Sequence, residues 1–563
     1  MLGAYIYLRV VLKTPGFTPA QATSTTETTK PAENFLDLKP KLIEKLQQLV
    51  KQGSNGLYNL FIHELKPDVL NSRISISDAS LVPDTTAIKN LIQSKNLPEA
   101  IFKIKADSIW IDGLGLKDIL SKDVIDVKTI RIHQPTIEVY NQKSAGHTDT
   151  SSKTLYQRLT TQLKHLGIDK VIIDGGTLIS HHPNNKPDAK FTDITINLSD
   201  ILIDSTTQFD RNRFLFAKDA ELSMKDYAVP SSNNLYTFKV GSFSISATKK
   251  LLVAKNIMLQ PHYSKDEFQQ HTKTQLERYS INIPSIEFKN TDWWKLINSE
   301  VLEADYARIN TADISVYLDR RKPSDGGMRR SFPHQLIMQL GMKINIRKLA
   351  VNDLDLSYEE YSTLSGKKGK MDIKNIHGTI SNLTNLPGVI SRNRFTTVVA
   401  SGVFMNIAPV DLTLKFDLAN YKTGNFSATL KSNSGFNGSA INSMSEPLGL
   451  FMVKKGNLKK LDAQVSGDNY KASGNVLMLY DDLHLTPLKK DQQNPGELKK
   501  KSVTSFIANS FVLKDENPTK DGQVRKETAS YTRKSGTFFN LIWKTIFVGI
   551  LKTIGAPEKL AYQ

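Results

Sequence analysis

The feature that most constrains this chain is a long match between two of its own segments. Ile104–Tyr140 aligns without a gap onto Ile281–Tyr317 at an offset of 177 residues, and nine of the 37 aligned positions are identical. Shorter matches before and after this stretch have an offset of 178. A constant offset over this distance predicts two tandem units of about 178 residues each, spanning 57–234 and 235–390.

The alternation of apolar and polar residues predicts that both units are mainly β. Apolar residues alternate with polar ones on both sides of Pro135, and the phase of the alternation changes there by one residue. The second copy changes phase at the equivalent place. Because a bulge or bend produces such a change, its repetition predicts an elongated, curved antiparallel sheet that forms a groove. The groove-wall candidates are Ile130, Ile132, Ile137, Val139, Ile309, Ile314 and Val316.

Few helices are expected between the strands. An amphipathic helix is predicted over 39–56, and a second leucine stripe, at Leu155, Leu159, Leu163 and Leu166, ends at Gly167. Short turns are expected at 117–122 and 293–299.

After the second unit, short strands separated by Gly and Asn predict a β-meander over 391–488. Its strands are expected at Phe395–Phe404, Val410–Phe416, Phe426–Lys431, Leu461–Val465 and Asn475–Tyr480. Residues 489–536 are polar and rich in lysine, which predicts a basic arm outside the core.

The segment 537–556 predicts a largely apolar, amphipathic helix. Two interpretations stay open: the helix lies at a membrane interface, or it docks on the protein's own sheet. From 486 to 563 there are 14 Lys plus Arg against 7 Asp plus Glu, and this excess favours an anionic membrane surface. The membrane-interface candidates are Phe538, Phe539, Trp543, Lys544, Phe547 and Lys552.

The N-terminal residues 1–13 are apolar, but they are too short to span a bilayer and Arg9 interrupts them. They resemble the end of a membrane anchor, and the alternative is an apolar terminus without structure. Residues 14–38 are rich in Thr, Pro and Ala, which is typical of a linker.

The sequence offers no motif for catalysis. The chain has no cysteine, which excludes disulfides and thiolate sites, and the spacings of phosphate loops, serine nucleophile elbows and zinc helices are absent. His181 and His182 precede Pro183 in a polar stretch, so we interpret them as solvated side chains. We therefore predict no catalytic residue, no metal site and no cofactor. The net charge of +18 is diluted along the chain outside its C-terminal part, so no nucleic-acid partner is expected.

The repeated pattern resembles the AsmA-like proteins of Gram-negative envelopes. In both copies a strand pair, a short helix and a second strand pair follow one another. The stretches that carry the resemblance are Phe102–Ile111 with Ile125–Tyr140, Ile281–Phe288 with Leu302–Leu318, the opening Lys41–Leu60 and Arg73–Asp84, and the closing Gly474–Leu483, Ser505–Pro518 and Phe538–Lys544. Together they cover most of Leu42–Gly555.

This resemblance implies a β groove with an apolar interior, associated with the inner membrane and projecting into the periplasm, although the anchor looks truncated in this sequence. Family members are linked to phospholipid traffic and outer-membrane homeostasis. We therefore expect a non-enzymatic protein that shields or transfers phospholipid acyl chains between the two membranes, with phospholipid, the membrane surface and envelope proteins as partners. The alternative is a structural or chaperone-like factor for outer-membrane protein assembly that works by edge pairing. A hydrolase of envelope polymers is the least favoured reading.

Overall fold

The computed structural model describes residues 35–562, apart from several gaps. These gaps are 55, 69, 95–97, 99, 115–123, 142–164, 182–186, 208–209, 211–212, 214–215, 300, 324–328, 492–496, 501–512 and 535. The predicted membrane-anchor remnant, most of the linker, the turn at 117–122, Leu155, Leu159, Leu163 and His182 therefore lie outside the described residues.

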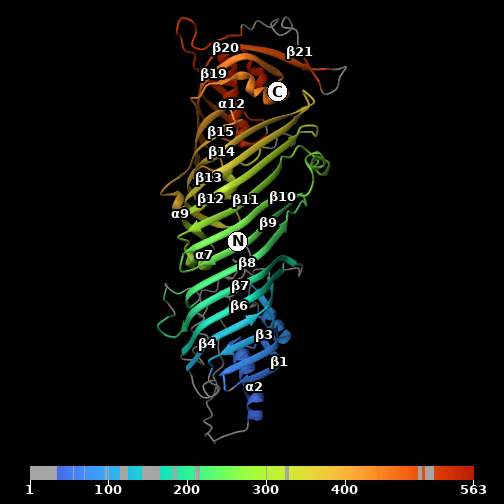
Figure 1. The fold of residues 1–563 in the computed structure, drawn as a ribbon, viewed down its shortest axis with the longest axis vertical. Coiled ribbons are helices and arrows are strands. Elements are labelled where there is room, and N and C mark those ends of the chain that lie inside the picture. Colours follow the sequence, from blue (N-terminus) through green and yellow to red (C-terminus); the bar gives the residue numbers. More distant parts are fainter. Residues whose placement is uncertain are drawn as a thin grey trace. The chain divides into compact units, whose positions relative to one another are not determined.

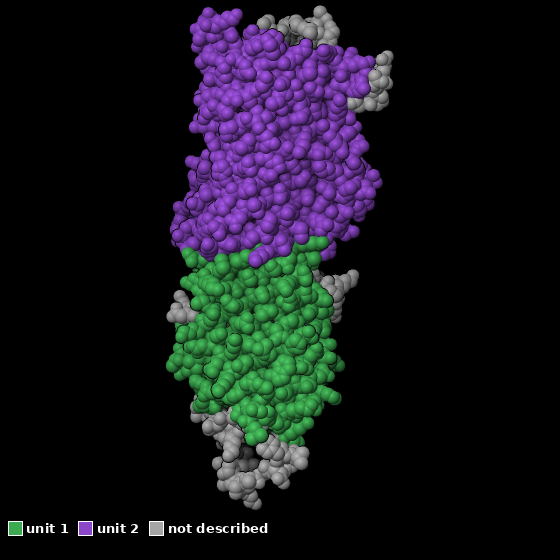
Figure 2. All heavy atoms as spheres, in the orientation of Figure 1, with its two compact units in different colours: residues 1–229, 239–254, 290–300 green, residues 230–238, 255–289, 301–563 purple. Residues whose placement is uncertain are grey.

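The described chain is mainly β, as predicted, and its strands belong to a large mixed sheet in which most neighbours are antiparallel (Figure 1). The prediction of an antiparallel sheet holds for most strand pairs, and a few pairs are parallel. The chain divides into two units (Figure 2). Unit 1 contains 1–229, 239–254 and 290–300, and unit 2 contains 230–238, 255–289 and 301–563.

Unit 1 begins with an amphipathic helix, which confirms the helix predicted near 39–56, and continues mainly as strands. The elements are α2 (Phe35–Gly53), β1 (Tyr58–Asp68), β2 (Arg73–Pro83), α3 (Thr85–Gln93), β3 (Ala100–Asp112), β4 (Val124–His133), β5 (Thr136–Asn141), β6 (His165–His181), β7 (Pro187–Ile203) and β8 (Ala217–Pro230). Leu166 and Gly167 lie in β6, so the predicted leucine helix is wrong at its C-terminal end.

The following elements carry the chain to the C-terminal helix. They are β9 (Tyr236–Ser246), β10 (Leu251–Pro261), α6 (Lys265–Phe268), η1 (Gln269–His271), β11 (Arg278–Lys289), α7 (Trp293–Ser299), β12 (Val301–Asp319), α8 (Pro333–Met338), β13 (Lys343–Ser362), β14 (Lys367–Thr384), α9 (Pro387–Ile390), β15 (Phe395–Phe404), β16 (Ala408–Asp417), β17 (Phe426–Ser432), β18 (Phe436–Asn437), η2 (Gly438–Ile441), α10 (Asn442–Gly449), β19 (Phe451–Gly467), β20 (Lys471–Lys490), β21 (Leu498–Lys500), β22 (Glu527–Thr532), α12 (Phe538–Thr553) and η3 (Glu558–Tyr562). The predicted turn at 293–299 and all five predicted meander strands are present.

Strand pairing recurs at the offset found in the sequence. Ile109 in β3 pairs with Ile132 in β4, and Ile286 in β11 pairs with Ile309 in β12. The next strand is parallel in both places: β4 and β5 pair with β6, and β12 pairs with β13. Parallel neighbours need a connection of a dozen or more residues. In both copies 23 residues separate the two strands, 142–164 in the first and 320–342 in the second.

One hydrogen bond also recurs. The backbone amide of Phe102 donates to the Tyr58 hydroxyl, and the amide of Tyr279 donates to the Tyr236 hydroxyl, both at 3.2 Å. The two stretches thus share a pairing pattern and a hydrogen bond from a backbone amide to a tyrosine hydroxyl, while their origin as a tandem repeat stays a prediction.

Residues with left-handed backbone angles lie where the alternation of apolar and polar side chains shifts by one residue. Asp78 in β2, Gln134 between β4 and β5, and Asp193 in β7 have φ angles of 51°, 45° and 50°. Asn256 in β10 and Asn375 in β14 have φ angles of 53° and 52°. A bulge at such a residue returns the apolar side chains on either side of it to one face of the sheet. Asp and Asn reach this conformation more readily than most residues because their short side chains bond locally.

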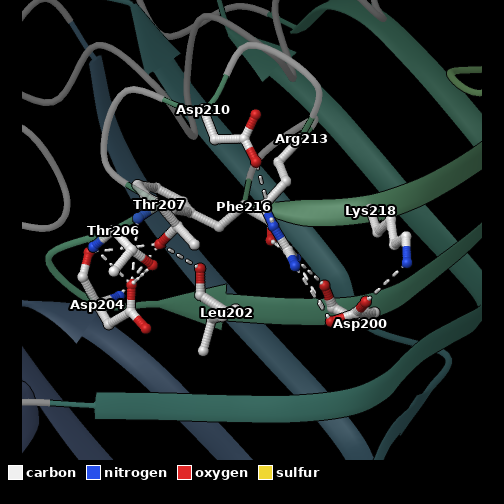
Figure 3. Close-up of polar contacts among 9 residues, drawn as sticks. All are labelled: Asp200, Leu202, Asp204, Thr206, Thr207, Asp210, Arg213, Phe216 and Lys218. Carbon is white, nitrogen blue, oxygen red and sulfur yellow. Dashed lines mark hydrogen bonds and ion pairs between the residues drawn. The ribbon is translucent and has the colours of Figure 1, made fainter.

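The turn between β7 and β8 in unit 1 is held by polar contacts (Figure 3). The Thr207 hydroxyl donates to the Leu202 carbonyl oxygen at 2.8 Å, and the Asp204 carboxylate accepts the Thr207 amide at 3.1 Å. The Arg213 guanidinium donates to the Asp200 carboxylate at 3.4 Å. These groups satisfy one another within the turn, so we assign them a structural role.

The predicted basic arm contributes to the core of unit 2. Its residues 527–532 form β22, which pairs antiparallel with β20, and both Ala529 and Tyr531 are buried. The prediction of an arm outside the core is therefore wrong for this part. The alternation in Ala529-Ser530-Tyr531 is too short to be distinguished from a loop by sequence, and pairing with β20 decides it.

Candidate functional site

In unit 1 the strand register aligns apolar side chains into rows across the sheet. Directly paired residues place their side chains on the same face. One row crosses seven strands and consists of Leu65, Ile76, Ile109, Ile132, Ile173, Ile196 and Leu222. The neighbouring row consists of Ile74, Ile111, Ile130, Val171, Leu198 and Ala220.

The other first-copy wall candidates lie beyond the bulge. Ile137 pairs with Ile104 on one side and Leu178 on the other, which makes a third apolar row. Val139 pairs with Phe102 and is fully buried, so it belongs to the core. The register therefore places Ile130, Ile132 and Ile137 in apolar rows and Val139 beneath the surface.

Unit 2 has equivalent rows. The first crosses five strands and consists of Ile281, Ile314, Leu356, Ile373 and Phe404. The second consists of Ile286, Ile309, Val351, Gly378, Ala400, Leu412 and Leu430. A third consists of Tyr279, Val316, Tyr358 and Met371. All three second-copy wall candidates are members of these rows.

The middle of these rows is only partly buried. Ile109, Ile132 and Ile173 in unit 1, and every member of the row through Ile314 in unit 2, retain intermediate solvent exposure. Inner faces of two packed sheets normally bury such residues completely. Sequence alternation cannot distinguish a covered face from an open one, because both alternate with period two.

The opposite face carries charges. In unit 2 the Arg308 guanidinium bonds the Glu287 carboxylate at 3.1 Å, and Arg347 bonds Asp305 at 2.7 Å. Arg308 directly precedes Ile309, so its side chain points away from the apolar row. The sheet of unit 2 therefore has one apolar face, open in its middle part, and one charged face.

The C-terminal helix α12 covers the far end of the apolar face in unit 2. Its buried side belongs to one hydrophobic cluster that includes Leu414, Ala428 and Val465, and the helix packs mainly against β20 and β22. Gly549 lets the helix approach β20, because a Cβ there would lie 2.5 Å from Val476 side-chain atoms. Of the two interpretations of this helix, docking on the protein's own sheet is the one that describes its packing in the structure.

The six membrane-interface candidates lie in different surroundings. Phe538 is buried in the core, and Phe547 packs partly against it. Lys552 donates to the Thr528 carbonyl oxygen at 2.9 Å and pairs with Glu558 at 3.3 Å. Phe539 and Trp543 are exposed by 59% and 39%. Trp543 stacks on Phe547, with ring centroids 5.7 Å apart.

A charged cluster lies in phase with the apolar rows of unit 2. Arg320 lies four residues after Val316 and directly follows the last residue of β12. Glu360 lies four residues after Leu356 in β13. The Arg320 guanidinium donates to the Glu360 carboxylate at 3.1 Å, and the Tyr358 hydroxyl also donates to it. Sequence reasoning missed this cluster; the signal was a charged residue continuing an apolar alternation.

Three further side chains are linked to this pair by electrostatic interactions, and we define the charged cluster as Glu277, Arg320, Arg330, Glu360 and Lys544. Arg330 pairs with the buried Glu277 at 3.0 Å. Burial opposes the charge of Arg320, yet its hydrogen bond with Glu360 raises the Arg320 pKa. Burial, followed by repulsion from Arg320, lowers the pKa of Lys544, while Glu360 opposes this shift. Among the described residues, no hydrogen bond or ion pair engages Lys544.

The predicted histidine loop differs from expectation. His181 is the last residue of β6, is buried, stacks on Tyr140 at 4.4 Å and pairs with Glu138 at 3.3 Å. The interpretation of His181 as solvated is therefore wrong, because Tyr140 and Glu138 of the neighbouring strand surround its ring. Within the described ranges, no group of three or more His, Asp or Glu side chains is arranged to hold a metal ion.

No helix in the described part of the chain is long and apolar enough to cross a membrane. The chain matches no model of a known protein family, and no curated protein matches it.

Proposed function

We propose that this chain is a non-enzymatic, AsmA-like lipid-handling protein of the Gram-negative envelope, and that its open apolar face shields phospholipid acyl chains in transit between the two membranes. The observation that carries the proposal is the set of partly exposed isoleucine and leucine rows described above. Water next to such a surface is unfavourable, and an acyl chain laid on it removes apolar area from water on both partners.

The dimensions of the rows suit an acyl chain. The row through Ile314 crosses five strands. At about 4.8 Å between neighbouring strands, it spans about 19 Å. One leaflet of a bilayer has a hydrocarbon depth of about 15 Å, half of the core thickness. Each methylene that leaves water contributes about 0.8 kcal/mol, so a single chain on such a row gains enough to be held without covalent chemistry.

Transfer then requires no catalytic residue. Each row has neighbours on the same face, in β11 to β14 of unit 2 and in β3 to β7 of unit 1. A chain that moves from one row to the next exchanges one apolar contact for another of the same kind. Movement would follow the gradient of lipid between donor and acceptor membranes, which fits the absence of catalytic motifs in the sequence.

The test is lipid bound to the purified protein. The full chain is purified in mild detergent, and bound lipid is extracted and quantified by mass spectrometry. We expect phospholipid with the unmodified chain and about a tenfold loss with Ile314→Asp, since a carboxylate in the row must be desolvated by an acyl chain. Ser315→Asp adds the same charge to the opposite face of β12 and should leave bound lipid unchanged.

Two results would count against the proposal. One is the absence of phospholipid from the unmodified chain, particularly if unfolded outer-membrane protein segments bind instead. The other is an Ile314→Asp variant that is folded by circular dichroism and retains its full lipid complement.

A further inference from the structure

We propose that unit 2 docks on an anionic phospholipid bilayer through exposed cations and aromatic rings that four segments of the chain bring together. Docking on a membrane is a separate activity from the shielding of acyl chains, and it needs no lipid in the apolar rows. We call these residues the basic loop surface, and its members are Arg329, Lys422, Tyr470, Lys471, Lys534 and Phe539. Phe539 is one of the six membrane-interface candidates.

The buried Arg533 side chain joins three of the segments. Its guanidinium donates to the carbonyl oxygens of Arg330 at 2.6 Å and Asn469 at 3.3 Å, and its backbone amide donates to the Tyr470 carbonyl oxygen at 2.7 Å. Asn469 extends the link to the fourth segment, because its side-chain amide donates to the Lys422 carbonyl oxygen at 2.8 Å. These contacts bring the loops before α8, after β16 and between β19 and β20 next to the residues that lead from β22 into α12.

Arg329 fixes the position of one aromatic ring. Its guanidinium lies over the Tyr470 ring, 4.6 Å from the ring centroid, and donates to the Arg533 carbonyl oxygen at 3.2 Å. A cation over the face of a tyrosine is attracted by the electrons of the ring. Tyr470 is nevertheless 59% exposed. The ring is therefore held at the surface and is not packed into the core.

Phe539 places a second ring at the surface. It lies in the first turn of α12 and is 59% exposed, while the preceding Phe538 is buried. The two rings meet edge to face, with centroids 5.3 Å apart. Phe538 also packs on Phe332, with ring centroids 5.0 Å apart, so the segment before α8 and the start of α12 share one core. An exposed ring on such a support loses little freedom when it enters a membrane interface.

The cations of the basic loop surface outnumber its carboxylates. All four are exposed, and within the described part of the chain none of them forms an ion pair; they are Arg329, Lys422, Lys471 and Lys534. The segments 329–332, 418–425, 467–471 and 533–539 contain a single carboxylate, that of Asp468, which accepts the backbone amide of Lys471 at 3.0 Å. The exposed cations therefore exceed the carboxylates by three, and the surface is complementary to a negatively charged partner.

A bilayer with anionic headgroups matches both features of this surface. Lysine and arginine side chains are attracted by the negative surface potential of such a bilayer. Aromatic rings enter the interface between headgroups and hydrocarbon, where Tyr470 can keep its hydroxyl in water. Stable membrane attachment commonly combines an apolar contribution with a basic one, because each alone is weak. The basic loop surface brings the two together on connected segments.

The experiment measures binding of the full chain to vesicles of phosphatidylcholine, with and without phosphatidylglycerol, by co-sedimentation. The unmodified chain should bind the vesicles that contain phosphatidylglycerol more tightly, and added salt should weaken this binding. The double variant Lys471→Gln with Lys534→Gln should bind them about 25-fold more weakly, since each cation near an anionic surface strengthens binding about fivefold. The matched control is Lys455→Gln with Lys459→Gln. It removes the same charge from unit 2, but these lysines pair with Asp482 at 2.9 Å and Asp481 at 2.6 Å, and vesicle binding should be kept.

A second pair of variants tests the aromatic contribution. Phe539→Ser should weaken binding to the same vesicles about tenfold, because the variant buries less apolar area in the interface. Phe61→Ser removes a ring of similar exposure, 55%, from β1 of unit 1 and should leave vesicle binding unchanged. Thermal unfolding checks that all variants are folded, which is expected because each substituted side chain is exposed.

Three results would overturn membrane docking by this surface. One is an unmodified chain that binds neither kind of vesicle, or binds both equally. Another is a folded Lys471 and Lys534 double variant that binds as its control does. The third is binding of single-stranded DNA that is as tight as vesicle binding and falls in the same variants, which would make a nucleic acid the partner. Copurification of phospholipid, which tests the proposed function, is a separate measurement, so either can fail without the other.

Discussion

The apolar face of unit 2 has two parts that differ in what covers them. In the hydrophobic cluster that includes the buried side of α12, Leu414, Ala428 and Val465 are at most 4% exposed. On β12 to β14, Ile314, Leu356 and Ile373 remain partly exposed on a face built by the same alternation. The strand sequences of the two parts look alike, so the difference comes from the segments that pack on them, α12 among them. An uncovered apolar face in a folded chain is a marker of binding.

The comparison predicts unequal costs for the same mutation. Leu414→Asp places a carboxylate in the covered part and should lower the free energy of unfolding by about 4 kcal/mol or more, because the cavity and desolvation terms add. Ile314→Asp keeps access to water and should cost about 1 kcal/mol. Urea unfolding of the full chain followed by circular dichroism measures both, and equal losses would mean that the two parts are covered alike.

Arg533 closes the covered part, and its loss should be nearly as severe. Its side chain is 1% exposed, donates to the carbonyl oxygens of Arg330 (2.6 Å) and Gly536, and lies over the Phe332 ring at 4.6 Å. Arg533→Met strands these carbonyl groups and should lower the free energy of unfolding by about 3 kcal/mol. The neighbouring Lys534 is exposed, and Lys534→Met should cost almost nothing in the same urea titration. A similar loss from both variants would contradict the role of Arg533.

Displacing α12 tests whether this helix alone buries the covered part of the apolar face. Gly549→Ala would place a methyl group 2.5 Å from Val476, and we expect α12 to shift, with a loss of about 2 kcal/mol in thermal unfolding. Gly341→Ala is the control because nothing lies within 4 Å of its new methyl group. Leu414 should then gain protease or hydrogen-exchange accessibility in the Gly549 variant only. If exchange in β16 is unchanged, another element covers it.

Acid should weaken the covered part selectively. His334 is fully buried and stacks on Phe416, neither ring nitrogen has a hydrogen-bond partner among the described residues, and burial lowers its pKa to about 4. Nearby Asp417 opposes this shift only in part. The unfolded chain takes up the proton near pH 6.5, before the folded chain does. Stability from neutral His334 is therefore present above that pH and is lost as the pH falls towards 4.

Between pH 7 and pH 5 we expect a loss of about 2 kcal/mol from this residue. His334→Phe keeps the ring contact with Phe416 and removes the titration, so its urea midpoint should fall less over the same range. Parallel pH profiles for the two chains would show that His334 is not the titrating group.

Much of the fold could be predicted because its signals are local. The strand predicted at Phe395–Phe404 has the bounds of β15, and the helix predicted at 537–556 contains α12. Phase changes along the strands correspond to residues such as Asp78 and Asn375 with left-handed backbones. Each of these features depends on a few neighbouring residues, whose preferences are visible in the sequence.

The candidate site was predictable only in part. Six of the seven wall candidates lie in the apolar rows, but their openness and the charged cluster were not foreseen. Arg320 and Glu360 come from different strands, and Lys544 lies 184 residues beyond Glu360 in sequence. The lysine-rich composition also misled at residues 527–532, which were predicted as part of a basic arm and form β22 by pairing with β20.

The sequence by itself determined the mainly β fold class, the placement of most strands, and the alternation that gives the sheet an apolar face. Only the tertiary structure decided that β12 and β13 run parallel, that α12 covers one end of the apolar face, and that Arg320 and Glu360 form an ion pair. The physical reason is the separation along the chain of the residues that interact. Alternation follows from the backbone geometry of single strands, whereas cover, pairing direction and charge balance depend on contacts between segments that the chain brings together only when it folds.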